Sequence, residues 1–78
     1  MLTNPILNAS AYRGQGLYAK AIQVIEDALP CIDPDYLVLA YREAFLAARD
    51  LGDVDAARSY AKKIAAIEPE LPSIKGWV

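Results

Sequence analysis

Three aspartates, Asp50, Asp53 and Asp55, form the densest group of side chains in this sequence that could bind a metal ion. A calcium loop needs further oxygen ligands and a bidentate glutamate later in the chain, and the spacing here provides neither. Aspartate is also favoured at the start of a helix, where it accepts backbone hydrogen bonds and meets the positive end of the helix dipole. We therefore interpret these residues as helix-capping residues and predict no metal site and no cofactor.

Nucleophilic and acid–base chemistry has few candidates in this chain. Cys31 is the only cysteine and histidine is absent, so an intrachain disulfide is excluded and the commonest general base is missing. We interpret Cys31 as a small, partly buried apolar side chain in the connector after the second helix. Paired aspartates would need opposed environments and an enclosed pocket to act as acid and base, which two helical hairpins rarely provide. We predict that the protein is not an enzyme.

Length, composition and charge exclude other classes. The chain has 78 residues, enough for one small domain, and 55% of them are hydrophobic, too many for a disordered tail. No apolar run approaches the ~20 residues that a membrane helix needs, and the first residues do not resemble a secretion signal. The net charge is -2, with the lysines and arginines spread along the chain. We therefore expect a cytoplasmic protein that binds neither a membrane nor nucleic acid.

Helix start and stop signals divide the chain into four helices. Asn4-Pro5 and Asp33-Pro34 are start signals, because asparagine and aspartate cap free amides and proline is tolerated in the first turn. Gly14 and Gly16 bracket a turn that should end the first helix, Gly52 suits the left-handed residue that ends the third helix, and Asp53 follows as a cap. Pro30 and Pro69 end the second and fourth helices. The predicted organisation is a single domain, residues 1–78, with one hairpin at about 4–30, another at about 34–68, and a capping tail at 69–78.

The two hairpins repeat one local design. The segments 16–22 and 52–58 both begin with glycine, continue into an alanine-rich helix and lie 36 residues apart. Such a period is typical of stacked helical hairpins, a scaffold that usually binds other molecules. The units differ in the third helix, where between Leu37 and Leu51 only Arg42, Glu43, Arg49 and Asp50 are charged. That helix is therefore either packed between neighbours or presents one face to a partner.

The second unit resembles a tetratricopeptide repeat. The resemblance rests on large, small and closing residues at the family's spacing, namely Tyr41, Ala44, Phe45, Ala48, Ala57, Ala61 and Pro69, although phenylalanine stands at Phe45 where the family favours a small residue. It implies an all-α fold of antiparallel helical hairpins stacked as a short right-handed array. It also implies a concave groove lined by the first helix of each hairpin, at Thr3, Ile6, Leu7, Ser10 and Arg13 and at Leu39, Arg42, Glu43, Leu46 and Arg49. The lysines and asparagines with which the family holds a terminal carboxylate are absent, since Ile6, Leu7 and Ser10 stand there.

The groove leads to two hypotheses of function. In the first, the protein is an interaction module that binds a peptide or helical partner through Leu39, Arg42, Glu43, Leu46 and Arg49, with Arg13 and Trp77 as further contacts. In the second, it is a structural fragment of a longer array, or a subunit of a homo-oligomer, with no ligand of its own.

Three observations have alternative interpretations. Leu39 and Leu46 are either anchors for a partner or covered by another element of the chain. The arginines either neutralise a ligand or pair with Asp35, Asp50 or Glu43. The tail either covers helix four with Leu71, Ile74 and Trp77 or docks on another subunit.

Overall fold

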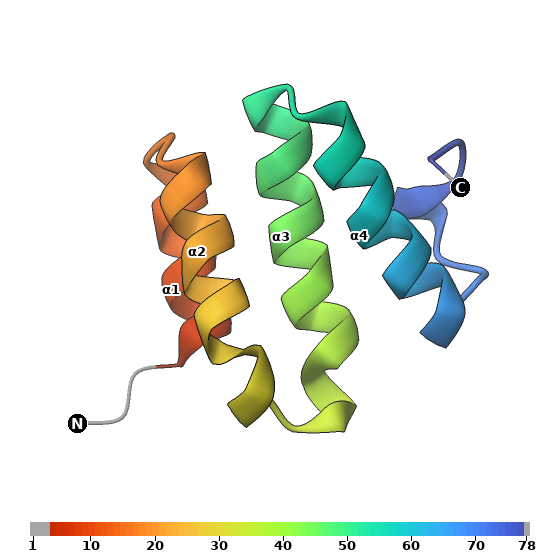
Figure 1. The fold of residues 1–78 in the computed structure, drawn as a ribbon, viewed down its shortest axis with the longest axis horizontal. Helices are drawn as coiled ribbons and strands as arrows, with labels where there is room; N and C mark the ends of the chain where they lie inside the picture. Colours follow the sequence, from red (N-terminus) through yellow and green to blue (C-terminus); the bar gives the residue numbers. More distant parts are fainter. Residues whose placement is uncertain (1–3, 78) are drawn as a thin grey trace.

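The computed structural model describes residues 4–77, and every regular element in that range is helical. Two antiparallel hairpins are joined by short 3₁₀ turns (Figure 1). The elements are α1 (Pro5–Gly14), α2 (Tyr18–Ala28), η1 (Leu29–Cys31), η2 (Pro34–Tyr36), α3 (Leu37–Leu51), α4 (Val54–Ile67) and η3 (Pro72–Ile74). The all-α prediction is confirmed. Thr3, one of the predicted groove positions, lies outside the described residues.

Side chains cap three of the helical segments at their starts. The Oδ1 atom of Asn4 accepts a hydrogen bond from the backbone N–H of Ile6 at 2.9 Å. Asp53 accepts in the same way from the backbone of Ala56 at 3.1 Å, and Asp33 accepts from Asp35 at 2.9 Å. Each of these bonds satisfies a backbone donor that the first turn of a helix leaves free. The three predicted caps are therefore confirmed.

Both hairpins turn at a glycine in the left-handed conformation. Gly16 has φ 79° and Gly52 has φ 88°, values that residues with a Cβ atom rarely adopt. The residue after each glycine donates its backbone N–H five residues back, from Leu17 to Tyr12 at 2.9 Å and from Asp53 to Ala48 at 3.0 Å. The same backbone hydrogen bond therefore recurs 36 residues apart, in agreement with the offset in the sequence.

Helix α3 lies in the middle of the molecule, between the first hairpin and α4 (Figure 1). Four of its alanines are fully buried, at Ala40, Ala44, Ala47 and Ala48. Small side chains let neighbouring helix axes approach closely, so α3 packs against α1, α2 and α4. Over most of its circumference α3 is therefore packed between neighbours, which is the first of the two interpretations of this helix.

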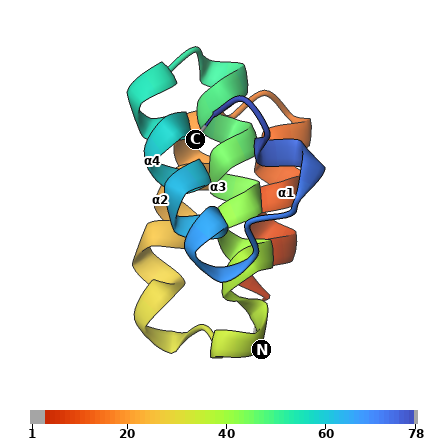
Figure 2. The same ribbon diagram turned by 90° about the vertical axis from the view of Figure 1, so that its right-hand side faces the viewer.

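The segment after α4 folds back onto the helices. Figure 2 shows it crossing the side of the molecule formed by α3 and α4. Ile74 is fully buried against the core, and Trp77 meets Phe45 of α3 edge to face, with ring centroids 5.3 Å apart and an interplanar angle of 88°. Such pairs are favourable beyond the apolar area that they bury. The tail therefore covers a part of α3 and α4 that would otherwise be exposed apolar surface.

Candidate functional site

A stripe of alternating apolar and basic side chains runs along α3. Leu39, Arg42, Leu46 and Arg49 follow one another at steps of three, four and three residues, which places them on one face of the helix. Leu39 is 47% exposed and both arginines are exposed, whereas Leu46 is only 9% exposed. Leu39 is therefore accessible to a partner, whereas only a small part of the Leu46 side chain is accessible. We call these four residues the α3 stripe.

An ion pair joins α1 to α3 beside this stripe. The Nε atom of Arg13 lies 3.0 Å from Oε2 of Glu43, and the two side chains are 26% and 11% exposed. The prediction that the arginines on α3 pair with Asp35, Asp50 or Glu43 is confirmed for Arg49, which lies 3.3 Å from Asp50. Glu43, however, pairs with Arg13 from the other hairpin. That contact was not predicted, since nothing local in the sequence connects residues 30 positions apart.

The remaining charge on this face belongs to Arg42. Among residues 4–77, Arg42 takes part in no ion pair, whereas the carboxylates of Glu43 and Asp50 are both engaged. On α1, Ile6 and Ser10 are partly exposed. The face shared by α1 and α3 therefore combines the exposed Leu39 with an arginine that has no counter-ion among residues 4–77.

Trp77, the other predicted contact residue, does not extend the α3 stripe. It lies on Phe45, which does not belong to the stripe, and is only partly exposed. The structure brings Leu39, Arg42, Glu43, Leu46, Arg49 and Arg13 onto adjoining parts of α1 and α3, and it places Trp77 in the packing of the tail.

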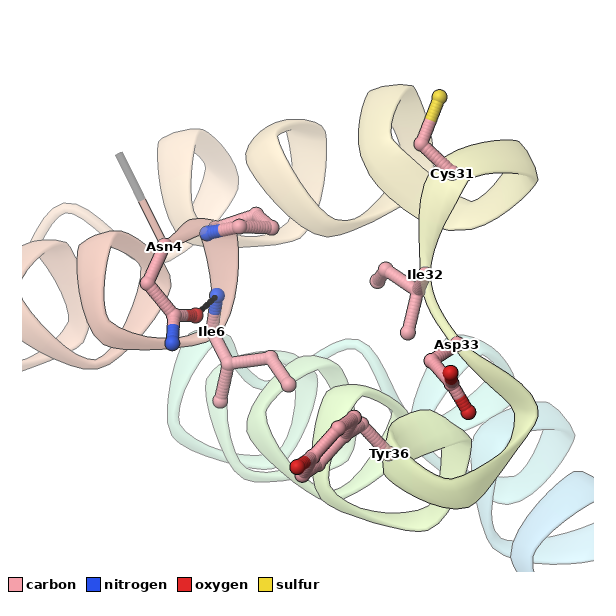
Figure 3. Close-up of a pocket in the computed structure, with 7 residues that line it drawn as sticks. Asn4, Ile6, Cys31, Ile32, Asp33 and Tyr36 are labelled. Atoms are coloured by element: carbon pink, nitrogen blue, oxygen red, sulfur yellow. Dashed lines mark hydrogen bonds between the residues drawn. The ribbon is translucent and has the colours of Figure 1, made fainter. Parts of the chain in front are cut away.

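A hollow lies at one end of the face shared by α1 and α3, between the start of α1 and the connector from α2 to α3 (Figure 3). Its volume is about 330 Å³, and its lining is Asn4, Pro5, Ile6, Cys31, Ile32, Asp33 and Tyr36. In Figure 3 the Sγ atom of Cys31 points away from Ile6 and Tyr36. Cys31 is exposed, so its predicted partial burial was wrong. The adjacent Ile32 is partly buried instead, because the backbone at the end of η1 turns Ile32 inward and Cys31 outward.

A polar cluster connects the two hairpins through α2 and α4. The hydroxyl of Tyr60 donates a hydrogen bond to the Glu26 carboxylate, and the Lys63 ammonium lies 5.7 Å from the ring centroids of both Tyr41 and Tyr60. Burial, followed by the hydrogen bond and the negative charge of Glu26, raises the pKa of Tyr60 well above its usual value. The phenol is therefore neutral at physiological pH and holds Glu26 against α4.

This shift predicts a loss of stability at alkaline pH. Above pH ~10 the unfolded chain loses the Tyr60 proton while the folded chain keeps it, so the free energy of unfolding falls as pH rises. Urea denaturation across this range should give a steeper decline for the wild type than for Tyr60→Phe, by up to about 1.4 kcal/mol per pH unit. Tyr36→Phe is the control, because Tyr36 is 55% exposed and should leave the slope unchanged. If the free energy of unfolding falls with the same slope in all three proteins, the pKa of Tyr60 is not raised in the folded state.

Two of the three clustered aspartates have structural partners, and the third, Asp55, lies in the first turn of α4. Asp53 caps α4 and Asp50 pairs with Arg49. Across the described residues no group of three or more histidine, cysteine, aspartate or glutamate side chains is arranged to hold a metal ion. No helix in the same range is both long enough and apolar enough to cross a membrane.

Comparisons with protein-family models, with curated proteins and with solved structures find no match for this chain. The structure defines an all-α protein of four helices with a folded-back C-terminal segment. The tetratricopeptide resemblance stays a prediction from the sequence.

Proposed function

We propose that this chain is a protein-interaction module that binds a peptide or helical segment of another protein along the face shared by α1 and α3. The partner lies across the α3 stripe. Binding of this kind uses apolar anchors for affinity and flanking charges for register.

The observation that carries the proposal is the exposure pattern of the α3 stripe. Leu39 keeps 47% of its surface exposed although the middle of α3, residues 43–48, is buried, and Arg42 lies on the same face without a counter-ion among residues 4–77. An exposed leucine alone is ordinary on a protein surface. A row of leucines and arginines at helical spacing is the arrangement that an amphipathic partner matches.

The proposal is tested by selecting peptides that bind the protein from a displayed library of random sequences. Each peptide is long enough for about four helical turns. The selected peptides should bind the wild type, and Leu39→Asp and Arg42→Glu should each weaken that binding by about tenfold or more. Lys62→Glu is the matched control, since Lys62 is exposed on α4 away from the stripe. Circular dichroism establishes that the variants are folded. The proposal is wrong if no peptide is selected, or if Leu39→Asp and Lys62→Glu weaken binding equally.

One observation favours the alternative of a structural or self-associating unit. At the 36-residue offset Leu7 corresponds to Glu43, which is buried and bonded to Arg13 of the other hairpin, whereas Leu7 is 66% exposed. The outer side of α1 is thus a repeat edge without a neighbour in residues 4–77. Sedimentation across a range of concentrations, with Trp77 emission recorded in parallel, tests this alternative. A monomer at every concentration would exclude self-association.

A further inference from the structure

The hollow at the end of the α1–α3 face is apolar in character. Ile6 and Ile32 are partly buried and the ring of Tyr36 closes one side, as Figure 3 shows. The Asn4 Oδ1 atom accepts from the backbone of Ile6, and the Asp33 Oδ1 atom accepts from that of Asp35. Both Oδ1 atoms are therefore engaged in helix capping, and Pro5, Ile6, Ile32 and the Tyr36 ring give the lining a mainly apolar surface that suits a hydrocarbon or aromatic group. Its volume of about 330 Å³ has room for one large side chain.

The charge at the rim of the hollow is negative. Among the described residues Asp33 is the only charged one in the lining, and Asp35, also exposed, follows two residues later. Neither carboxylate takes part in an ion pair in the described part of the chain. A cationic group beside the apolar side chain would therefore be favoured over an anionic one.

The hollow also adjoins the surface proposed to bind a partner. The lining includes Ile6 of α1 and Tyr36, which precedes Leu39 of the α3 stripe by about one helical turn. A segment lying along that face reaches the hollow without leaving the surface. Asp35 and Arg42 are seven residues apart, about 10 Å along the helix axis, so the negative rim and the uncompensated arginine mark opposite ends of the site.

We propose that the hollow is the anchor pocket for a bulky apolar side chain of the bound peptide, with a lysine or arginine of the peptide next to it. This inference rests on the proposed function, since the peptide is the one that binds along α1 and α3. It also gives the peptide a direction: the anchor and the cationic residue lie at the rim formed by Asp33 and Asp35, and an acidic residue about 10 Å from Asp35 faces Arg42.

Two small probes of opposite charge test the pocket directly. Phenethylamine and 3-phenylpropionate both carry a phenyl ring on a two-carbon chain, and they differ in the charge of the end group. Each is titrated into the whole chain with ¹³C-labelled isoleucine methyl groups. Phenethylamine should shift the methyl signals of Ile6 and Ile32 saturably, with 3-phenylpropionate binding about twofold to fivefold more weakly. Ile67 is exposed on α4 and its methyl signal should not move.

Two variants separate the apolar and the charged contributions. Tyr36→Ala should weaken phenethylamine binding by about twofold to tenfold, because the aromatic wall is lost. Asp33→Asn should reduce the preference for the amine, since only Asp35 then remains at the rim, while the helix stays capped because asparagine caps as well as aspartate. The pocket is disproved if Ile6 and Ile32 show no saturable shift, or if Ile67 moves as much as they do. Equal affinity of the wild type for both probes disproves the charge preference.

The peptides selected against the α1–α3 face distinguish this inference from the proposed function. If Leu39→Asp weakens peptide binding but Tyr36→Ala does not, the face binds peptides and the hollow is not their anchor. If both variants weaken it and the selected sequences share a bulky apolar residue next to lysine or arginine, the anchor pocket is established. If no peptide is selected although phenethylamine binds, the proposed function fails and the hollow loses its role as a peptide anchor.

Discussion

Replacing Phe45 by alanine is expected to lower the free energy of unfolding by about 3–5 kcal/mol, the usual range for a fully buried phenylalanine. Phe45 has no exposed surface and is the partner of Trp77, so its loss leaves a cavity in α3 and also frees the tail. Small domains have total stabilities of about 5–15 kcal/mol, so this single change removes a large part of what is available. Urea denaturation followed by circular dichroism measures the difference.

Trp77 reports on the same substitution by a second route. Because the indole loses its edge-to-face contact with Phe45, its emission should move to longer wavelength in the folded variant as well. Leu39→Ala is the control on the same helix. Leu39 is about half exposed, so its truncation should lower the free energy of unfolding by less than about 1 kcal/mol and leave Trp77 emission unchanged. Similar losses for the two variants would show that the tail does not depend on Phe45.

Arg13→Ala is expected to lower the free energy of unfolding by about 1–3 kcal/mol, because it leaves the Glu43 carboxylate, only 11% exposed, without its partner. Glu43→Gln in the same background should recover part of this loss, since the amide has no charge to compensate. A double-mutant cycle should give a coupling energy of about 0.5–3 kcal/mol, measured by urea denaturation. The pair joins α1 to α3, so the coupling measures how firmly the two hairpins are held together.

The exposed pair Arg49–Asp50 provides the comparison for that cycle. Arg49 and Asp50 are neighbours on one helix, with side chains 46% and 31% exposed, and such pairs contribute about 0–1 kcal/mol. Arg49→Ala should therefore lower the free energy of unfolding less than Arg13→Ala does. Added salt should reduce the effect of Arg49→Ala more strongly, because exposed charges are screened more strongly. If the two substitutions lower the stability equally, the Arg13–Glu43 bond does not help to hold the hairpins together.

Local features of this protein were predictable because their causes lie within a few residues. Asn4, Asp33 and Asp53 cap helices through bonds to amides two or three positions away. Gly52 ends α3 because it alone of its neighbours adopts φ 88° without strain. The period of 36 residues follows from these signals, and its recurrence in the backbone hydrogen bonds required no knowledge of distant contacts.

The candidate site was only partly predictable. Spacing placed Leu39 and Leu46 on one face, but one is 47% exposed and the other 9%, because the neighbours of α3 cover its two ends differently. The sequence also could not show which of Cys31 and Ile32 is buried. Two adjacent apolar residues in a connector have no helical periodicity that would identify the side chain facing the core. The hollow beside Tyr36 was missed because its walls come from two segments about 30 residues apart.

The sequence by itself determined the helical class, the ends of the helices, the 36-residue repeat and the set of side chains available on each helix face. Those properties depend on backbone conformation and on hydrogen bonds within single turns. Only the tertiary structure decided which faces were covered: Glu43 bonds Arg13, Tyr60 bonds Glu26, and Trp77 lies on Phe45. Each of these contacts joins residues 30 or more positions apart, and their geometry depends on how closely the buried alanines of α3 let the helices approach.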